Sequence, residues 1–212
     1  MTRAPEDLVL ASSSPRRVEL LRHLGLPFRV LAPDVDEEAA SAGRAEPAAI
    51  AAARAAAKVA AGLAQAPGGT VIAADTLVVC DGAVLGKPGG PADAERMLRL
   101  LAGRSHAVIT ALAVGRGGDV AQAVEYATVT FRPLQEEEIR RYAASAEPLD
   151  KAGGYGLQGA GALFVSRIEG EYGTVVGLPL CRLGLMLRAL GCPLPAEPGP
   201  GTRAGGGSAV PM

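Results

Sequence analysis

Short apolar runs alternate, in the first third of the chain, with stretches whose apolar residues recur at helical spacing. Residues 8–11 and 28–31 are apolar runs that predict strands, and an apolar stripe from Val18 to Leu24 predicts a helix between them. Pro47 opens an alanine-rich stretch that predicts a helix to about Gln65, where a Pro-Gly-Gly sequence stops it. This order is typical of strand–helix–strand crossovers.

The rest of the chain carries strand, hairpin and helix signals. Residues 70–74 predict a strand that ends at Asp75-Thr76, and Asp81-Gly82 predicts a hairpin turn between the apolar runs 77–80 and 83–85. The remaining predicted elements are helices at about 91–101, 135–144 and 179–190, and strands at about 106–114, 120–131, 163–168 and 174–176.

Parallel-type crossovers followed by a long hairpin predict an α/β fold with a mixed sheet. The 212 residues correspond to one ordinary domain, which we assign to residues 1–194. Residues 195–212 contain almost no large apolar side chains, so little offsets the entropy lost on ordering them. We expect these residues to form a disordered tail rich in glycine and proline.

Composition and charge argue against several classes of protein. The 21 basic and 22 acidic residues give a net charge of −1, which argues against stable nucleic-acid binding, as does an aromatic content of 3%. No apolar run approaches the roughly 20 residues that span a bilayer. No signal-peptide core follows the N-terminus, so we expect a cytoplasmic protein with no membrane partner.

The cysteines and histidines limit the metal chemistry. Three widely spaced cysteines without a C-x-x-C motif argue against a disulfide scaffold or a structural zinc site. Two histidines are too few for a multi-histidine site. Any divalent metal would be held by oxygens, which favours Mg²⁺ or Mn²⁺.

The segment Ser12-Ser13-Ser14-Pro15-Arg16-Arg17 has the features of an anion site. A strand end, a serine-rich turn and a helix start bring backbone N–H groups and hydroxyls to one point, where the helix dipole favours negative charge. The two arginines add bidentate donors suited to phosphate. The same residues would also make an ordinary capped helix, with Ser14 as its N-cap and two solvated arginines.

Acidic residues provide a second candidate site. Asp75, at the predicted end of a strand, could bind a metal or deprotonate a water, although a turn residue is the alternative. The acidic loop Asp34–Glu38 would complete a hard-oxygen metal site if it folds near Asp75. Otherwise it is a solvated loop.

Lysines are scarce among the basic residues, and only Lys58, Lys87 and Lys151 occur. A retained lysine in such a chain hints at a site that needs a compact ammonium group. Lys87 lies in Gly-Lys-Pro, which is not a P-loop, but it could reach a phosphate as a point charge.

The glycine-rich stretch 147–161 is the last candidate. Gln158 could read a base edge by paired hydrogen bonds, and the alternative is a long surface loop. His106, on a predicted strand, is expected to be structural.

Five motifs follow one another along the chain. They are Ser-Ser-Ser-Pro-Arg-Arg-x-Glu-Leu-Leu (12–21), Ala-Asp-Thr (74–76), Gly-Lys-Pro (86–88), Glu-Pro-x-Asp-Lys-Ala-Gly-Gly-Tyr-Gly-x-Gln-Gly (147–159) and Gly-Leu-Pro-Leu (177–180). In this order they resemble the Maf (septum formation inhibitor) family of nucleoside triphosphate pyrophosphatases. The resemblance implies an elongated, twisted mixed sheet flanked by helices, with two lobes around a cleft. It also implies a homodimer.

The resemblance further implies metal-assisted hydrolysis of a nucleoside triphosphate to the monophosphate and pyrophosphate. The Asp-Lys-Ala-Gly-Gly-Tyr form is similar to the branch that acts on dTTP and UTP, and modified nucleotides are a further substrate class. The implied roles are Asp75 as general base, Glu37 and Asp75 on the metal, and Ser12, Ser14, Arg16, Arg17, Arg54, Thr76, Lys87, Lys151 and Gln158 on the substrate.

Two questions stay open at this stage. The family usually has Lys-Ala where this chain has Arg54-Ala55, with Lys58 one turn later, so either side chain could supply the charge. The runner-up function is a nucleotide-binding regulator of cell division without essential catalysis, and nonspecific nucleic-acid binding is a third alternative.

Overall fold

The computed structural model describes residues 7–192 and 194, and it contains one seven-stranded mixed sheet. The sheet order is β2-β1-β3-β5-β6-β7, with β4 paired to part of β3. The strands are β1 (Leu8–Ala11), β2 (Arg29–Leu31), β3 (Thr70–Cys80), β4 (Ala83–Leu85), β5 (Ser105–Arg116), β6 (Asp119–Phe131) and β7 (Val165–Glu169). The pairs β1–β2 and β1–β3 are parallel and the others are antiparallel, which confirms the predicted mixed α/β sheet.

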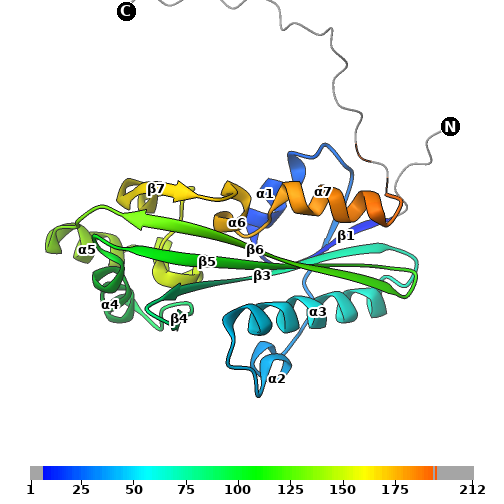
Figure 1. The fold of residues 1–212 in the computed structure, drawn as a ribbon, viewed down its shortest axis with the longest axis horizontal. Helices are drawn as coiled ribbons and strands as arrows, with labels where there is room; N and C mark the ends of the chain where they lie inside the picture. Colours follow the sequence, from blue (N-terminus) through cyan, green and yellow to red (C-terminus); the bar gives the residue numbers. More distant parts are fainter. Residues whose placement is uncertain (1–6, 193, 195–212) are drawn as a thin grey trace, which may run out of the picture.

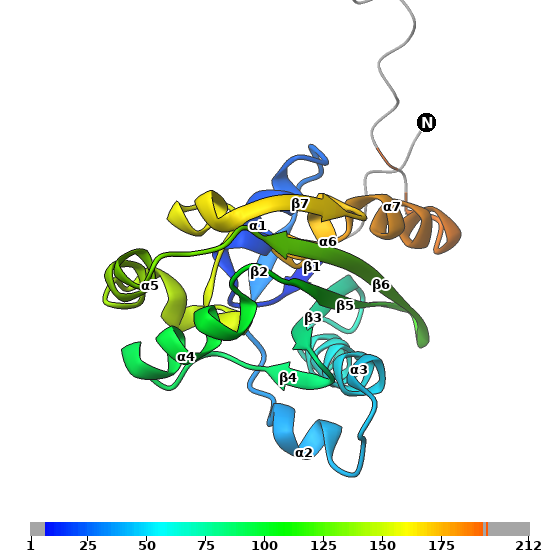
Figure 2. The ribbon, with the colours of Figure 1, turned by 60° about the vertical axis from the view of Figure 1, so that its left-hand side comes forward.

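Helices cover both faces of the long sheet (Figure 1). They are α1 (Pro15–Arg22), α2 (Glu37–Ser41), α3 (Pro47–Gln65), α4 (Pro91–Leu101), α5 (Glu136–Ala143), α6 (Tyr172–Val176) and α7 (Leu180–Ala189), with short 3₁₀ helices η1 (Glu147–Asp150), η2 (Ala152–Gly154) and η3 (Ala160–Phe164). In Figures 1 and 2, α3 lies on one face of the sheet, and α1 and α7 lie on the opposite face. The helices α4 and α5 lie at one end of the sheet, on the left in Figure 1.

Three hydrophobic clusters match this arrangement. One lies between the sheet and the helices α1 and α7, and includes Leu21 and Leu187. A second lies under α3 and includes Val59. The third fills the other end of the sheet, where Leu98 of α4 packs near Phe131 of β6. The domain therefore has two lobes that share the long strands β3, β5 and β6.

Helix α3 packs very closely on the sheet because its buried positions carry small side chains. A Cβ atom added at Gly62 would lie 2.7 Å from Cγ1 of Val71 and 3.3 Å from Cβ of Ala11. With 19 residues, α3 is long and apolar enough to cross a membrane by length and composition alone, which corrects the expectation that no segment approaches that length. In the fold, however, its stripe of Ala51, Ala55, Val59 and Gly62 is buried against the sheet.

Strand β3 is longer than predicted, and this changes the position of Asp75. The strand does not end at Asp75-Thr76 but continues to Cys80, because residues 70–79 pair with β5 along one edge. On the other edge β1 pairs with residues 70–72 and β4 with residues 78–80. Residues 73–77 thus have no strand neighbour on that edge, and Asp75 lies at this gap in the sheet.

Two other expectations need correction, and a third concerns residues outside the described part of the chain. Glu37 and Glu38 belong to the short helix α2, whose N-cap Asp36 accepts hydrogen bonds from two backbone N–H groups, so the acidic segment is not simply a loop. Residues 174–176 are the end of helix α6 and not a strand. The predicted tail, residues 195–212, lies outside the described residues.

Candidate active site

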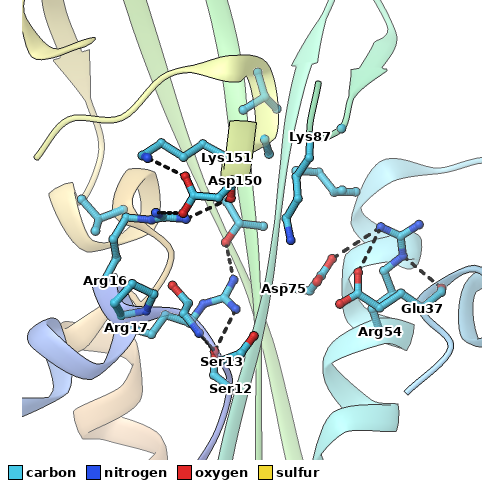
Figure 3. Close-up of a pocket in the computed structure, with 18 of the residues that line it drawn as sticks. Ser12, Ser13, Arg16, Arg17, Glu37, Arg54, Asp75, Lys87, Asp150 and Lys151 are labelled. Atoms are coloured by element: carbon cyan, nitrogen blue, oxygen red, sulfur yellow. Dashed lines mark hydrogen bonds and ion pairs between the residues drawn. The ribbon is translucent and has the colours of Figure 1, made fainter. Parts of the chain in front are cut away.

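A cleft of about 640 Å³ opens at the gap in the sheet. Its lining comes from the turn after β1, from α1, α2, α3 and β3, from the segment after β4, and from the 150–158 region (Figure 3). The structure brings to this one cleft every residue to which the family resemblance assigns a role: Ser12, Ser14, Arg16, Arg17, Glu37, Arg54, Asp75, Thr76, Lys87, Lys151 and Gln158. Of the acidic segment, Asp34 and Asp36 do not line it.

One wall of the cleft surrounds Asp75, which is only 5% exposed. Its Oδ1 accepts a hydrogen bond of 2.7 Å from Nζ of Lys58, and the same Nζ lies 2.8 Å from Oε1 of Glu37. Oδ2 of Asp75 is buried and has no hydrogen-bond partner among the described residues. An unpartnered carboxylate oxygen at a cleft wall is a group that can take a proton or a cation.

Both candidate cations of α3, Arg54 and Lys58, belong to this wall. Arg54 and Lys58 are four residues apart and therefore lie on the same helix face. Nε of Arg54 donates to the backbone oxygen of Glu37 at 3.1 Å and to Oγ of Ser41 at 3.2 Å, while its Nη1 lies 4.0 Å from Oδ2 of Asp75. Both cations reach both carboxylates: Lys58 lies within 2.8 Å of Glu37 and of Asp75, whereas Nη1 of Arg54 lies 3.9 Å from Oε2 of Glu37 and 4.0 Å from Asp75.

These positive charges change the titration of Glu37. Partial burial by itself raises the pKa of Glu37, but the hydrogen bond from Lys58 and the charges of Lys58, Arg54 and Lys87 outweigh it and lower the pKa below its usual value. Glu37 is therefore an anion at neutral pH.

Arg17 forms the opposite wall. Its guanidinium donates to the backbone oxygen of Gly177 at 2.8 Å, to Oγ1 of Thr76 at 3.0 Å and to Oγ of Ser12 at 3.4 Å. Thr76 is held in turn by Thr110, whose Oγ1 lies 3.0 Å away. Burial lowers the pKa of Arg17 below its usual value, although an arginine stays charged at neutral pH. The guanidinium of Arg17 is therefore a cation that is buried and held in place near the start of α1.

Arg16 and the 147–159 region meet at the side of the cleft. Nη1 of Arg16 lies 2.7 Å from Oδ2 of Asp150, and Nζ of Lys151 lies 2.6 Å from Oδ1 of the same carboxylate. Burial by itself raises the pKa of Asp150, but the hydrogen bonds and charges of Lys151 and Arg16 outweigh this effect and lower the pKa below its usual value. A carboxylate thus holds two cations, Arg16 and Lys151, that were predicted to bind the substrate.

The serines and Lys87 complete the lining. Ser14 is the N-cap residue of α1, as predicted, but its side chain makes no capping hydrogen bond, and its backbone N–H donates to Oγ of Ser12 at 3.2 Å. Lys87 makes no hydrogen bond or ion pair within the described residues, and in Figure 3 it extends into the cleft above Asp75. Its ammonium group is therefore available to an anionic ligand.

The donor set fits a hard divalent cation that keeps part of its water shell. Glu37 and Asp75 contribute two carboxylates, and Oδ2 of Asp75 has no hydrogen-bond partner among the described residues, with Nη1 of Arg54 4.0 Å away. Within the described residues no cluster of three or more His, Cys, Asp or Glu side chains is placed to hold a metal. Mg²⁺ is commonly held in this way, by one or two carboxylates together with phosphates of the substrate.

Two parts of the site were not found from the sequence. Lys58 was only an alternative to Arg54, and nothing in the spacing indicated that it would join Asp75 to Glu37. Asp150 was visible as part of a charged glycine-rich motif, but its partner Arg16 lies 134 residues away. Such contacts depend on the topology of the sheet, so local patterns carry no signal for them.

The chain is similar to known proteins over most of its length. Residues 7–190 match the family model described as Maf-like protein. A dTTP/UTP pyrophosphatase of Moorella thermoacetica is 52% identical over 190 residues, which cover 87% of this chain and 95% of that protein. One of Symbiobacterium thermophilum is 49% identical, covering 89% and 96%. A solved HAM1 protein from Coxiella burnetii has a TM-score of 0.41 and 17% identity, over 57% of this chain and 70% of that one. The chain belongs to the Maf family.

Proposed function

We propose that this protein hydrolyses dTTP and UTP to the nucleoside monophosphate and pyrophosphate, with water attacking the α-phosphorus and a divalent metal assisting. The observation that carries the proposal is the buried Oδ2 of Asp75, which accepts no hydrogen bond from the described residues, in a cleft lined by Arg16, Arg17 and Lys87. Cleavage of a phosphoanhydride needs positive charge and an oriented water, with little covalent chemistry from the protein. The names of the relatives support this choice of substrates.

The cationic groups bind and orient the triphosphate. Arg17 is the fixed donor because its guanidinium is already held by Thr76 and Gly177. Arg16 and Lys151 exchange part of their contact with Asp150 for phosphate oxygens, and Lys87 approaches as a point charge. Ser12 and Ser14 donate at the start of α1, where the helix dipole favours an anion.

The general base is Asp75. It takes one proton from the attacking water, whose oxygen forms the new bond to the α-phosphorus while the bond from that phosphorus to the bridging oxygen breaks. The electron pair of the broken bond leaves with pyrophosphate, whose added negative charge the arginines and Lys87 stabilise. No covalent enzyme intermediate is needed.

Glu37 and Asp75 would hold the metal, Mg²⁺ or Mn²⁺. When bound, the metal supplies neutralisation of charge on the phosphates. Lys58 contacts both carboxylates at 2.8 and 2.7 Å, so it sets their separation and competes with the cation for their oxygens. We therefore expect metal affinity to depend on Lys58 as well as on the two carboxylates.

A panel of nucleoside triphosphates with identification of the products tests the proposal. With Mg²⁺ or Mn²⁺ we expect dTTP and UTP to give the monophosphate and pyrophosphate, and release of orthophosphate would contradict it. Asp75→Asn should lower kcat at least about 100-fold, the usual contribution of a general base. The matched control is Asp93→Asn, a carboxylate on α4 outside the cleft lining. If the Asp75→Asn variant loses turnover but still affects cell division as the native protein does, the result would favour the regulator instead.

Further proposals concern the assembly, location, domain extent and substrate range of the protein. We propose a homodimer, which sedimentation velocity tests by distinguishing a 21.4 kDa particle from one of twice that mass. We propose a cytoplasmic location and a single catalytic domain over residues 1–194. Modified pyrimidine triphosphates belong in the substrate panel as a further class.

A further inference from the structure

Gln158 is held by a residue of helix α1. Nε2 of Gln158 donates a hydrogen bond of 3.0 Å to Oε2 of Glu19, which lies 139 residues earlier in helix α1. This is the one hydrogen bond that the Gln158 side chain makes within the described residues. Gln158 lines the cleft, whereas Glu19 does not. Any effect of Glu19 on a ligand would therefore act through Gln158.

The contact fixes the orientation of the Gln158 amide. An ionised carboxylate can only accept hydrogen bonds, so Glu19 selects the NH₂ end of the amide and turns Oε1 away from itself. Without such a partner the two ends of an amide exchange by rotation of the last side-chain torsion, which is broad and roughly two-fold. Glu19 thus determines on which side Gln158 presents an acceptor and on which side a donor.

Other contacts hold the backbone that carries Gln158. Oε2 of Glu147 accepts from the backbone N–H of Ala160 at 3.0 Å, and Oε1 accepts from that of Gly161 at 3.2 Å. Arg16, three residues before Glu19, ties the same helix face to Asp150. The amide is therefore presented from a fixed backbone, with its remaining rotation controlled by Glu19.

The orientation of an amide distinguishes uracil and thymine from cytosine. At positions 4 and 3, uracil and thymine present an acceptor and then a donor (O4 and N3–H), whereas cytosine presents a donor and then an acceptor (the N4 amino group and N3). A bound amide pairs with one pattern in one orientation and with the other pattern after it flips. Gln158 is exposed. A base that covers it with the wrong pattern leaves the polar groups of the contact unpaired, and this disfavours the wrong substrate.

We propose that Glu19 is a positioning residue that sets base specificity: it fixes the Gln158 amide in the orientation that pairs with uracil or thymine and rejects cytosine. The inference rests on the proposed triphosphate pyrophosphatase activity. The phosphate groups lie at the start of α1, and Glu19 lies one turn further along that helix, about 4.5 Å along its axis from Arg16. This leaves the base end of the cleft to Gln158.

Three substitutions at Glu19 test the proposal through the ratio of kcat/KM for UTP to that for CTP. Glu19→Gln can accept or donate and frees the amide, so we expect the ratio to fall about fivefold. Glu19→Ala removes the partner and should have the same effect. Glu19→Lys can only donate, so it selects Oε1 and should shift the ratio furthest towards CTP. Both substrates carry the same phosphates, so changes in charge at residue 19 cancel in the ratio.

Controls separate this proposal from a structural effect. Glu137→Gln neutralises an exposed carboxylate of α5 and should leave the ratio unchanged. Thermal melting should show that the Glu19 variants remain as stable as the native protein, because Glu19 is exposed. A lower kcat for both substrates with an unchanged ratio is what a merely structural role predicts, and it would overturn the proposal.

The outcomes distinguish this inference from the proposed function. Native protein that hydrolyses UTP in preference to CTP, with variants that change that preference in the stated order, supports both. Native activity on UTP with a ratio that stays within twofold in all three variants overturns the role of Glu19 and leaves the proposed function standing. Absence of pyrophosphate release from any triphosphate overturns both.

Discussion

The buried His106 makes the stability of the domain depend on pH. His106 is 3% exposed on β5, its Nε2 lies 2.7 Å from the hydroxyl of Tyr155, and its Nδ1 has no partner among the described residues. Edge-to-face contacts with Phe131 and Tyr155 surround the ring, with centroids 5.1 and 5.4 Å away. Burial lowers the pKa of His106 from its usual 6.5 to about 4. The expected structural role agrees with these contacts.

The sign of the effect follows from proton uptake. Between pH 6.5 and pH 4 the unfolded chain binds a proton at His106 and the folded chain does not, so stability falls as the pH is lowered through this range. Above pH 6.5 the contribution is fully present. With these two pKa values, His106 alone costs about 2 kcal/mol of stability between pH 7 and pH 5.

Urea unfolding at pH 7 and pH 5 measures this contribution. The comparison is between the native protein and the double variant His106→Phe/Tyr155→Phe, which removes both partners of the hydrogen bond and avoids leaving the hydroxyl unsatisfied. We expect the native protein to lose about 2 kcal/mol more than the double variant. Equal losses in the two proteins would refute the assignment, because the other titrating groups are common to both.

Three further substitutions test the cleft and its scaffold. Lys87→Gln should raise KM for dTTP about tenfold without changing the melting temperature. The control Arg96→Gln, at an exposed residue of α4, should leave KM unchanged, and equal effects of the two substitutions on KM would contradict the role of Lys87. Gly62→Ala should destabilise the fold by about 1 kcal/mol in urea unfolding, because the added methyl group meets Val71, and Gly68→Ala, with open space around it, should not. Glu147→Gln should lower the melting temperature by weakening its hydrogen bonds to two backbone N–H groups, and an unchanged melting temperature would show that this carboxylate is dispensable.

Elements with strong local signals were predicted well. The helix α3 begins at Pro47 and ends at Gln65 as expected, because proline fixes its first turn and a Pro-Gly-Gly sequence ends it. The hairpin at Asp81-Gly82 is also confirmed, and both residues have the positive φ angles that a two-residue turn of this kind requires.

The predictions from sequence were wrong where tertiary contacts override the local preference of the chain. Asp75 and Thr76 have the polar character of a strand end, yet the strand continues because β5 pairs beyond them and Thr76 is hydrogen-bonded to Thr110. The β-branched run at 174–176 suggested a strand but forms the end of a short helix that Gly177 closes with a left-handed conformation.

The residues of the site were predicted from motifs, but their partners were not. Local spacing indicated that Arg16, Asp75 and Gln158 carry chemistry. It gave no sign that Arg16 would pair with Asp150, that Lys58 would join Asp75 to Glu37, or that Glu19 would hold Gln158. The contacts of Arg16 and Glu19 arise because α1 lies against the 147–159 region, and that of Lys58 arises because α3 packs beside β3 and α2. A single sequence does not encode such distances locally.

The central claim is that water attacks the α-phosphorus of a triphosphate beside Asp75. Hydrolysis of dTTP in water enriched with oxygen-18, followed by mass spectrometry of both products, tests it most directly. We predict that the heavy oxygen enters dTMP and that pyrophosphate carries none. Heavy oxygen in pyrophosphate would place the attack on the β-phosphorus and contradict the account.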